Sequence, residues 1–243
     1  MDKDIVEEMS VVDHLRELRK RIMIIIFFIA VVSIIIYSKV HYLIDFFMIP
    51  INKFNLELVY FSLTDGFIAR MELSLVTGTI IVIPVILYQI AKFINPGLTK
   101  KEKRFLYRNL FFISILLILG MAFGYILLIP YVLKFLILYG EEYMNPLLSG
   151  ITYFNFVGLF CFFIGLVFLI PYVIVLLGKL SLLTAKRLKK FRKYVIIFTL
   201  TLEGLFISSA GIIPWLLLAL PIIILYEIGI WIVKFMEKKR NKN

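Results

Sequence analysis

Long uninterrupted apolar runs, each bounded by charged residues, constrain the fold of this chain more than any other feature of its sequence. Of the 243 residues 62% are hydrophobic, and the mean hydropathy is +0.99. A soluble domain of this composition would have too little polar surface to face water. The runs are continuous, whereas a membrane barrel would need alternating apolar and polar residues. We therefore expect an all-α, polytopic membrane protein.

The apolar runs predict six transmembrane helices in a single integral membrane domain, residues 1–243. The spans are expected at about 22–37 (or 22–40), 67–93, 105–138, 153–180, 194–208 and 212–235. The fifth is short, because about 15 residues rise only about 22 Å against a hydrocarbon core of about 30 Å. The sixth is interrupted by Pro214 and Pro221, so the fifth and sixth helices are both expected to be short. Residues 10–21 are expected to form a cytoplasmic amphipathic helix on the headgroups before the 22–235 bundle, and residues 236–243 a basic tail.

The distribution of charge predicts the orientation. Of the 27 lysines and arginines, 23 lie before the first span, in or beside the loops after the second and fourth spans, or at and beyond the end of the sixth span. The other four are Lys39, Lys53, Arg70 and Lys134. Because lysine and arginine accumulate on the cytoplasmic side, both termini should be cytoplasmic in a multi-pass protein of the cytoplasmic (inner) membrane. The net charge of +11 then reflects topology and contact with anionic lipid headgroups, not binding of nucleic acid.

Patterns typical of enzymes and metal sites are missing from the sequence. It contains no Gly-rich phosphate loop, no close pair of carboxylates within a span, and no serine or cysteine nucleophile with a suitable histidine. His14 and His41 are far apart and lie outside any carboxylate or thiol cluster, and the single cysteine, Cys161, lies in an apolar run. We expect no enzymatic activity, no metal and no cofactor.

The stretch PVILYQIAKFINPGLTKKEKR, from Pro84 to Arg104, holds the most informative polar residues. Its Asn-Pro-Gly sequence ends the second span in a basic loop. This stretch, HLRELRKRI (14–22), GMAFGYILLIP (120–130) and LLLALPIIILYEIG (216–229) occur in an order that resembles the TatC family. TatC proteins are the multispanning receptor subunits of the twin-arginine protein translocase. The resemblance extends from about residue 10 to residue 235.

The resemblance implies a function and a site. A TatC-like protein binds twin-arginine signal peptides on folded precursor proteins. It exports them with single-span TatA/TatB-type partners, in an oligomeric complex driven by the proton-motive force. The residues that match the family's signal-peptide site are Glu17, Arg19, Gln89, Phe93 and Glu102, and Pro50, Pro84 and Pro96 match structural prolines. The chemistry agrees, because two adjacent arginines require two carboxylates and each guanidinium pairs bidentately with one.

Several polar positions depart from the family pattern. Leu169 stands where an acid commonly precedes the proline of the fourth span, residues 208–211 replace a Thr-Pro-Pro-Asp run, and Glu72 stands where lysine is frequent. Acids inside a membrane are costly. Glu203, in the middle of the fifth predicted span, therefore either compensates for Leu169 at a partner-docking site or is neutral and bonded to a neighbouring carbonyl or Ser209.

Two other functions are compatible with parts of the sequence. A small-solute secondary transporter would also have polar residues at mid-membrane and broken helices. Glu203 and the proline-interrupted spans fit that description weakly. An insertase or scaffold without a ligand of its own is the third interpretation.

Overall fold

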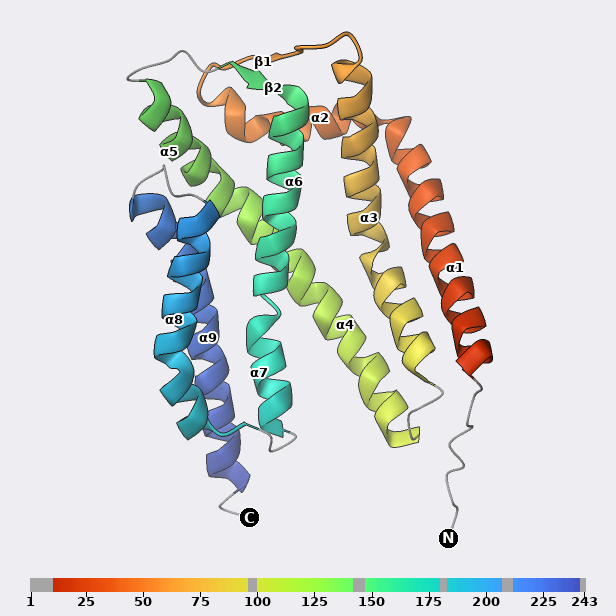
Figure 1. Cartoon of the computed structure of the whole chain (residues 1–243), viewed down its shortest axis with the longest axis vertical. Helices are drawn as coiled ribbons and strands as arrows, with labels where there is room; N and C mark the ends of the chain where they lie inside the picture. Colours follow the sequence, from red (N-terminus) through yellow and green to blue (C-terminus); the bar gives the residue numbers. More distant parts are fainter. Residues whose placement is uncertain (1–10, 96–99, 142–146, 180–182, 207–211, 241–243) are drawn as a thin grey trace. The chain divides into compact units, whose positions relative to one another are not determined.

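The computed structural model describes residues 11–95, 100–141, 147–179, 183–206 and 212–240, and these are helical almost throughout (Figure 1). The helices are α1 (Val11–Tyr37), α2 (Val40–Asn52), α3 (Asp65–Ile94), α4 (Lys100–Phe123), α5 (Ile129–Glu141), α6 (Gly150–Val167), α7 (Ile170–Lys179), α8 (Ala185–Phe206) and α9 (Ile212–Arg240). A π-helix, η2 (Gly124–Leu128), joins α4 to α5, and the short strands β1 (Leu58–Val59) and β2 (Leu148–Ser149) pair in parallel. The all-α prediction is confirmed.

Five stretches of the described chain are long and apolar enough to cross a membrane: Val12–Tyr37, Asp65–Ile94, Tyr107–Leu138, Gly150–Lys179 and Ala219–Arg240. They coincide with five of the six predicted spans. The remaining predicted span, 194–208, lies on α8, which begins at Ala185 because the basic segment before Tyr194 continues the same helix. The prediction that the fifth and sixth helices are short is wrong, since α8 has 22 residues and α9 has 29 and continues through Pro221. Residues 207 and 208 lie outside the described residues, and the count of six spans stays a prediction.

The N-terminal segment differs from its prediction in one respect. Residues 11–21 are helical, but they are the first turns of α1, which continues through Tyr37 without a break. No glycine or proline lies near Arg21 and Ile22, so nothing in the backbone ends a helix there. A separate helix lying on the headgroups is therefore not found.

Prolines explain where the other long segments bend or break. Pro171 cannot donate a hydrogen bond to the carbonyl of Val167, where α6 ends and gives way to α7. The π-helix η2 lies directly before Pro130, whose missing donor likewise disturbs the regular ladder. Pro84 is accommodated within α3. Pro50, which matches a structural proline of the family, lies inside α2, where it is buried.

The contacts divide the chain into two compact units. The first comprises the segments up to Ile49, Glu57–Ile115 and Leu148–Gly158, and the second comprises Pro50–Leu56, Leu116–Leu147 and the chain from Leu159 onward. The single-domain organisation therefore stays a prediction, and each unit is described by itself.

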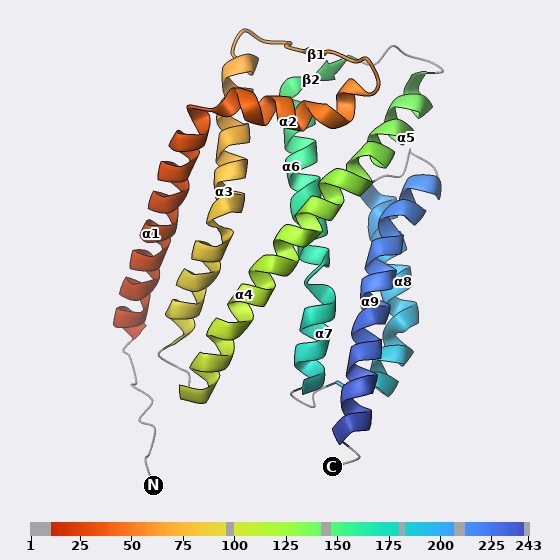
Figure 2. The same ribbon diagram turned by 180° about the vertical axis from the view of Figure 1, so that it is seen from behind.

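In the first unit α1 lies along α3 in both views (Figures 1 and 2). Gly78 permits this approach, because a Cβ at that position would lie 2.3 Å from Ser33 Oγ and 3.1 Å from Ser33 N. Glu72, which departs from the family pattern, accepts a 2.7 Å hydrogen bond from Asn155 Nδ2 on α6. The acid at position 72 thus has a partner within the same unit.

In the second unit α9 packs against both α7 and α8. The buried hydroxyl of Tyr226 donates to the carbonyl of Leu188, on α8, at 2.9 Å. Ile230 and Val233 are almost fully buried in the core cluster that α9 shares with Ile174 of α7. These contacts fix which face of α9 is covered by protein and which is left exposed.

Candidate functional site

The start of α1 lies beside the end of α3 in the first unit (Figure 1), and side chains of the two helices are in contact there. His14, Glu17 and Arg21 recur at a spacing of three and four residues, which places them on one face of α1. Gln89 and Phe93 are four residues apart and share a face of α3 in the same way. The two faces oppose each other, because Arg21 bonds Gln89 and His14 stacks on Phe93. We call these five residues the α1–α3 cluster.

The polar centre of the cluster is the guanidinium of Arg21. Its Nη2 donates to Glu17 Oε1 at 2.7 Å, and its Nη1 donates to Gln89 Oε1 at 3.3 Å. The side chains of Glu17 and Arg21 are each only 16% exposed, and Gln89 is buried. Partial removal from water strengthens the attraction relative to a surface ion pair and raises the cost of leaving either charge alone.

Two atoms of this ion pair lack hydrogen bonds. Glu17 Oε2 and Arg21 Nε are buried without a hydrogen-bond partner among the described residues. A buried polar atom without a partner costs about 1–3 kcal/mol. The cluster therefore holds a carboxylate that is only half satisfied and that can accept a further donor.

An aromatic pair borders the ion pair. The rings of His14 and Phe93 stack with their centroids 4.3 Å apart and their planes 25° from parallel. Phe93 thus adds an apolar ring at the level of His14, which lies one helical turn before Glu17 on the same face of α1.

The structure places the other predicted site residues as follows. Arg19 is exposed on α1 and is not part of the cluster. Glu102 lies in the first turn of α4, but its side chain is outside the described part of the chain. The rings of Tyr88 and Tyr107 are 5.8 Å apart and connect the start of α4 to the end of α3. Position 102 is about 7.5 Å from Tyr107 along the helix axis.

The remaining predicted residues fall partly outside the description. Pro96 lies outside the described residues. Glu203 belongs to the backbone of α8, but its side chain is not described. Sequence reasoning did not include His14 and Arg21 in the site. The spacing of four residues between Glu17 and Arg21 is the signal that marks them as an ion pair.

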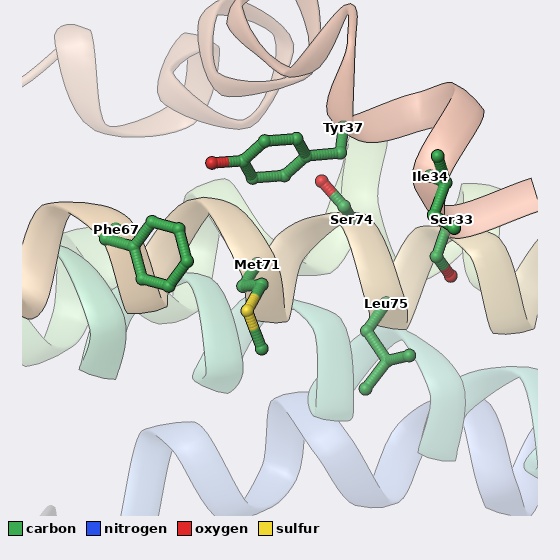
Figure 3. Close-up of a pocket in the computed structure, with 7 residues that line it drawn as sticks. All are labelled: Ser33, Ile34, Tyr37, Phe67, Met71, Ser74 and Leu75. Carbon is green, nitrogen blue, oxygen red and sulfur yellow. The ribbon is translucent and has the colours of Figure 1, made fainter. Parts of the chain in front are cut away.

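A cavity of about 310 Å³ lies farther along the same two helices. It is lined by Ser33, Ile34 and Tyr37 of α1 and by Phe67, Met71, Ser74 and Leu75 of α3 (Figure 3). The hydroxyl of Ser74 is already bonded to the carbonyl of Arg70, at 2.7 Å. None of these seven lining residues carries a charge.

Comparison with known proteins decides the family. The family model of the Sec-independent protein translocase protein (TatC) matches residues 13–221. The chain belongs to the TatC family. TatC of Carboxydothermus hydrogenoformans is 33% identical over 231 residues, covering 95% of each chain. TatC of Aquifex aeolicus is 34% identical over 238 residues, covering 96% of this chain and 98% of its own.

Solved TatC structures share the fold. Two crystal structures titled as the twin-arginine translocase receptor TatC, one of them in DDM, superpose with TM-scores of 0.73 and 0.74. Their identity to this chain is 34% and 35%, and each match covers 91% of it. The resemblance and the protein-transport function predicted from sequence are confirmed. Membership of the TatC family favours a multi-pass membrane component of a protein translocase over a small-solute carrier.

Proposed function

We propose that this TatC-family protein binds twin-arginine signal peptides and that the α1–α3 cluster forms part of the binding site. The observation that carries the proposal is the half-satisfied carboxylate of Glu17, with one oxygen on Arg21 and the other buried without a described partner. A signal-peptide arginine supplies a planar, permanently charged donor that fits such an oxygen. The stacked ring of Phe93 supports an apolar contact beside it.

Binding is proposed to proceed by exchange of one guanidinium for another. A bidentate arginine pair uses both carboxylate oxygens. The incoming arginine therefore takes Glu17 Oε1 from Arg21 and also bonds Oε2, which has no partner among the described residues. Arg21 remains within reach of Gln89, which holds it at 3.3 Å before exchange.

The second signal arginine is proposed to pair with Glu102. That residue lies in the first turn of α4, near the end of α3, as the contact between Tyr88 and Tyr107 supports. Arg19 is included in the site on the family resemblance alone. The two carboxylates would then discriminate a pair of arginines from a single one.

The assembly is proposed to follow the family. Both termini would be cytoplasmic in the inner membrane, and TatA/TatB-type single-span partners would join an oligomeric complex that has no catalytic step of its own. Single cysteines introduced in a Cys161→Ser background test the topology. Cysteines at Lys101 and Lys190 should be labelled from the cytoplasm and one at Glu142 from outside. Cytoplasmic labelling at Glu142 would contradict six spans.

Site-specific cross-linking tests signal binding. A photoreactive residue beside the paired arginines of a precursor should cross-link to the full-length protein in membranes. Glu17→Gln should reduce the yield by at least about tenfold, since it removes a charge-assisted pair of about 1.5–3 kcal/mol. Asp13→Asn changes the charge equally on the exposed side of α1 and should leave the yield unchanged. Equal yields from the two stably inserted variants would remove the cluster from the site.

A further inference from the structure

A basic cavity of about 440 Å³ lies against α9 in the second unit. Its lining includes three exposed lysines, one acid and two aromatic rings: Lys189, Lys234, Lys238, Glu227, Trp231 and Phe235. The acid is already paired, because Arg192 of α8 donates to Glu227 and forms an ion pair with it. The three ammonium groups are therefore not cancelled by Glu227, and the cavity suits an anion.

An apolar groove continues from this cavity along α9. Its volume is about 500 Å³, and Ile224, Ile228 and Ile232 line it together with Glu227 and Trp231, which both cavities share. The three isoleucines are each four residues apart and extend about 12 Å along the helix. That length covers most of one leaflet of the hydrocarbon core, about 15 Å. The groove is long enough for much of an acyl chain.

Hydrogen bonds between α8 and α9 hold the helix that lines both cavities. Tyr226, beside Glu227, is bonded to the carbonyl of Leu188 on α8. Glu237 Oε1 accepts the backbone N–H of Ala185 at 3.0 Å, so this second acid near the lysines is also engaged. The exposed face of α9 is thus held in place before a ligand arrives, which lowers the ordering cost of binding.

We infer that this face of α8 and α9 binds an anionic phospholipid. The phosphate lies among the three lysines, one acyl chain follows the isoleucine groove, and Trp231 marks the boundary between them. Lysine stems reach toward headgroups from the ends of membrane helices, and tryptophan prefers that level. Free phosphate would satisfy the lysines but leave the groove empty, whereas a zwitterionic lipid would fill the groove without matching the charge. The inference does not depend on signal-peptide binding.

Fluorescence quenching of Trp231 tests the site. The chain has two tryptophans, so Trp215→Phe leaves Trp231 as the only one. The full-length protein is reconstituted in phosphatidylcholine vesicles that contain a minor fraction of acyl-brominated phosphatidylglycerol or, separately, of acyl-brominated phosphatidylcholine. The brominated anionic lipid should quench at least about fivefold more efficiently at equal mole fraction, since each nearby lysine contributes about fivefold to anionic preference. Equal quenching by the two lipids would overturn the inference.

Matched charge variants separate the site from general attraction to the membrane. The preference should disappear in Lys189→Gln/Lys234→Gln/Lys238→Gln and persist in Lys186→Gln/Lys190→Gln/Lys239→Gln, which removes the same charge from residues outside the cavity lining. Equal loss in both triple variants would show a nonspecific surface effect. Loss of the preference on adding inorganic phosphate at constant ionic strength would assign the site to free phosphate. Native mass spectrometry of the unmodified chain should retain phosphatidylglycerol over phosphatidylcholine, and the reverse order would also refute the inference.

Discussion

Replacing Arg21 with glutamine should tighten signal-peptide binding. Arg21 now occupies one oxygen of the Glu17 carboxylate, at 2.7 Å, and any peptide arginine that binds bidentately must displace it. Glutamine removes the positive charge but keeps a side-chain amide that can donate a hydrogen bond. The exchange step is thereby removed while the receiving carboxylate stays in place.

The expected gain can be bounded from the geometry. Two unit charges 4 Å apart attract by about 4 kcal/mol at an effective dielectric constant of 20. Exposed pairs of this spacing on a helix contribute only about 0.3–0.5 kcal/mol. The interaction free energy of two side chains that are each 16% exposed lies between these limits. The new pair between Glu17 and the peptide arginine recovers much of the free energy lost when the pair between Glu17 and Arg21 breaks. A residual release cost of about 1–2 kcal/mol corresponds to a Kd lowered about 5–30-fold.

Equilibrium binding of a fluorescent twin-arginine signal peptide to the detergent-solubilised, full-length protein measures this change. Lys20→Gln is the matched control, because Lys20 is exposed on the adjacent position of α1 and loses the same charge. Lys20→Gln should leave the Kd within about twofold of that of the unchanged protein, since an exposed charge contributes little to the binding free energy. If Arg21→Gln weakened binding while Lys20→Gln did not, Arg21 would position Glu17 for the peptide and would not compete with it.

Three further changes probe other parts of the molecule. Glu102→Lys should block cross-linking to a twin-arginine precursor, and Glu102→Gln should weaken it less, because lysine repels the peptide arginine whereas glutamine keeps a hydrogen-bond acceptor. Equal effects of the two variants would exclude a charge interaction. Gly78→Val should lower the thermal unfolding midpoint through about 1–3 kcal/mol of overpacking against Ser33, and Gly66→Ala, where the nearest atom is 3.5 Å away, should not. Glu203→Leu should retain precursor binding but abolish transport in a vesicle assay if this acid docks a partner, and normal transport would reject that role.

The spans were predictable because their signal is local. The apolar run expected at 67–93 becomes α3, Asp65–Ile94, since hydropathy and helix length are both properties of one segment. The continuity of α1 was missed because a change from charged to apolar residues was read as a change of element. Helical backbone continues through such a change unless glycine or proline stops it, as the course of α1 past Arg21 demonstrates.

The site was only half predictable from sequence, for a different reason. Family resemblance brought Glu17, Gln89 and Phe93 together, but it did not reveal what occupies the carboxylate. The spacing between Glu17 and Arg21 permits an ion pair, yet the same spacing on a surface helix would leave both groups in water. Only the packing of α1 against α3 makes the pair partly buried and adds Gln89 as a third member.

The ion pair between Glu17 and Arg21 is contained within one helix, and this has a consequence for biogenesis. Gln89 lies 68 residues beyond Arg21 in the chain. At a synthesis rate of about 5–20 residues per second, it follows roughly 3–14 seconds later. During that interval Glu17 approaches the membrane with Arg21 already available four residues away. The nascent helix therefore presents a neutral pair to the insertion machinery. The Glu17 carboxylate has its counter-charge before the segment that contains Gln89 has been synthesised.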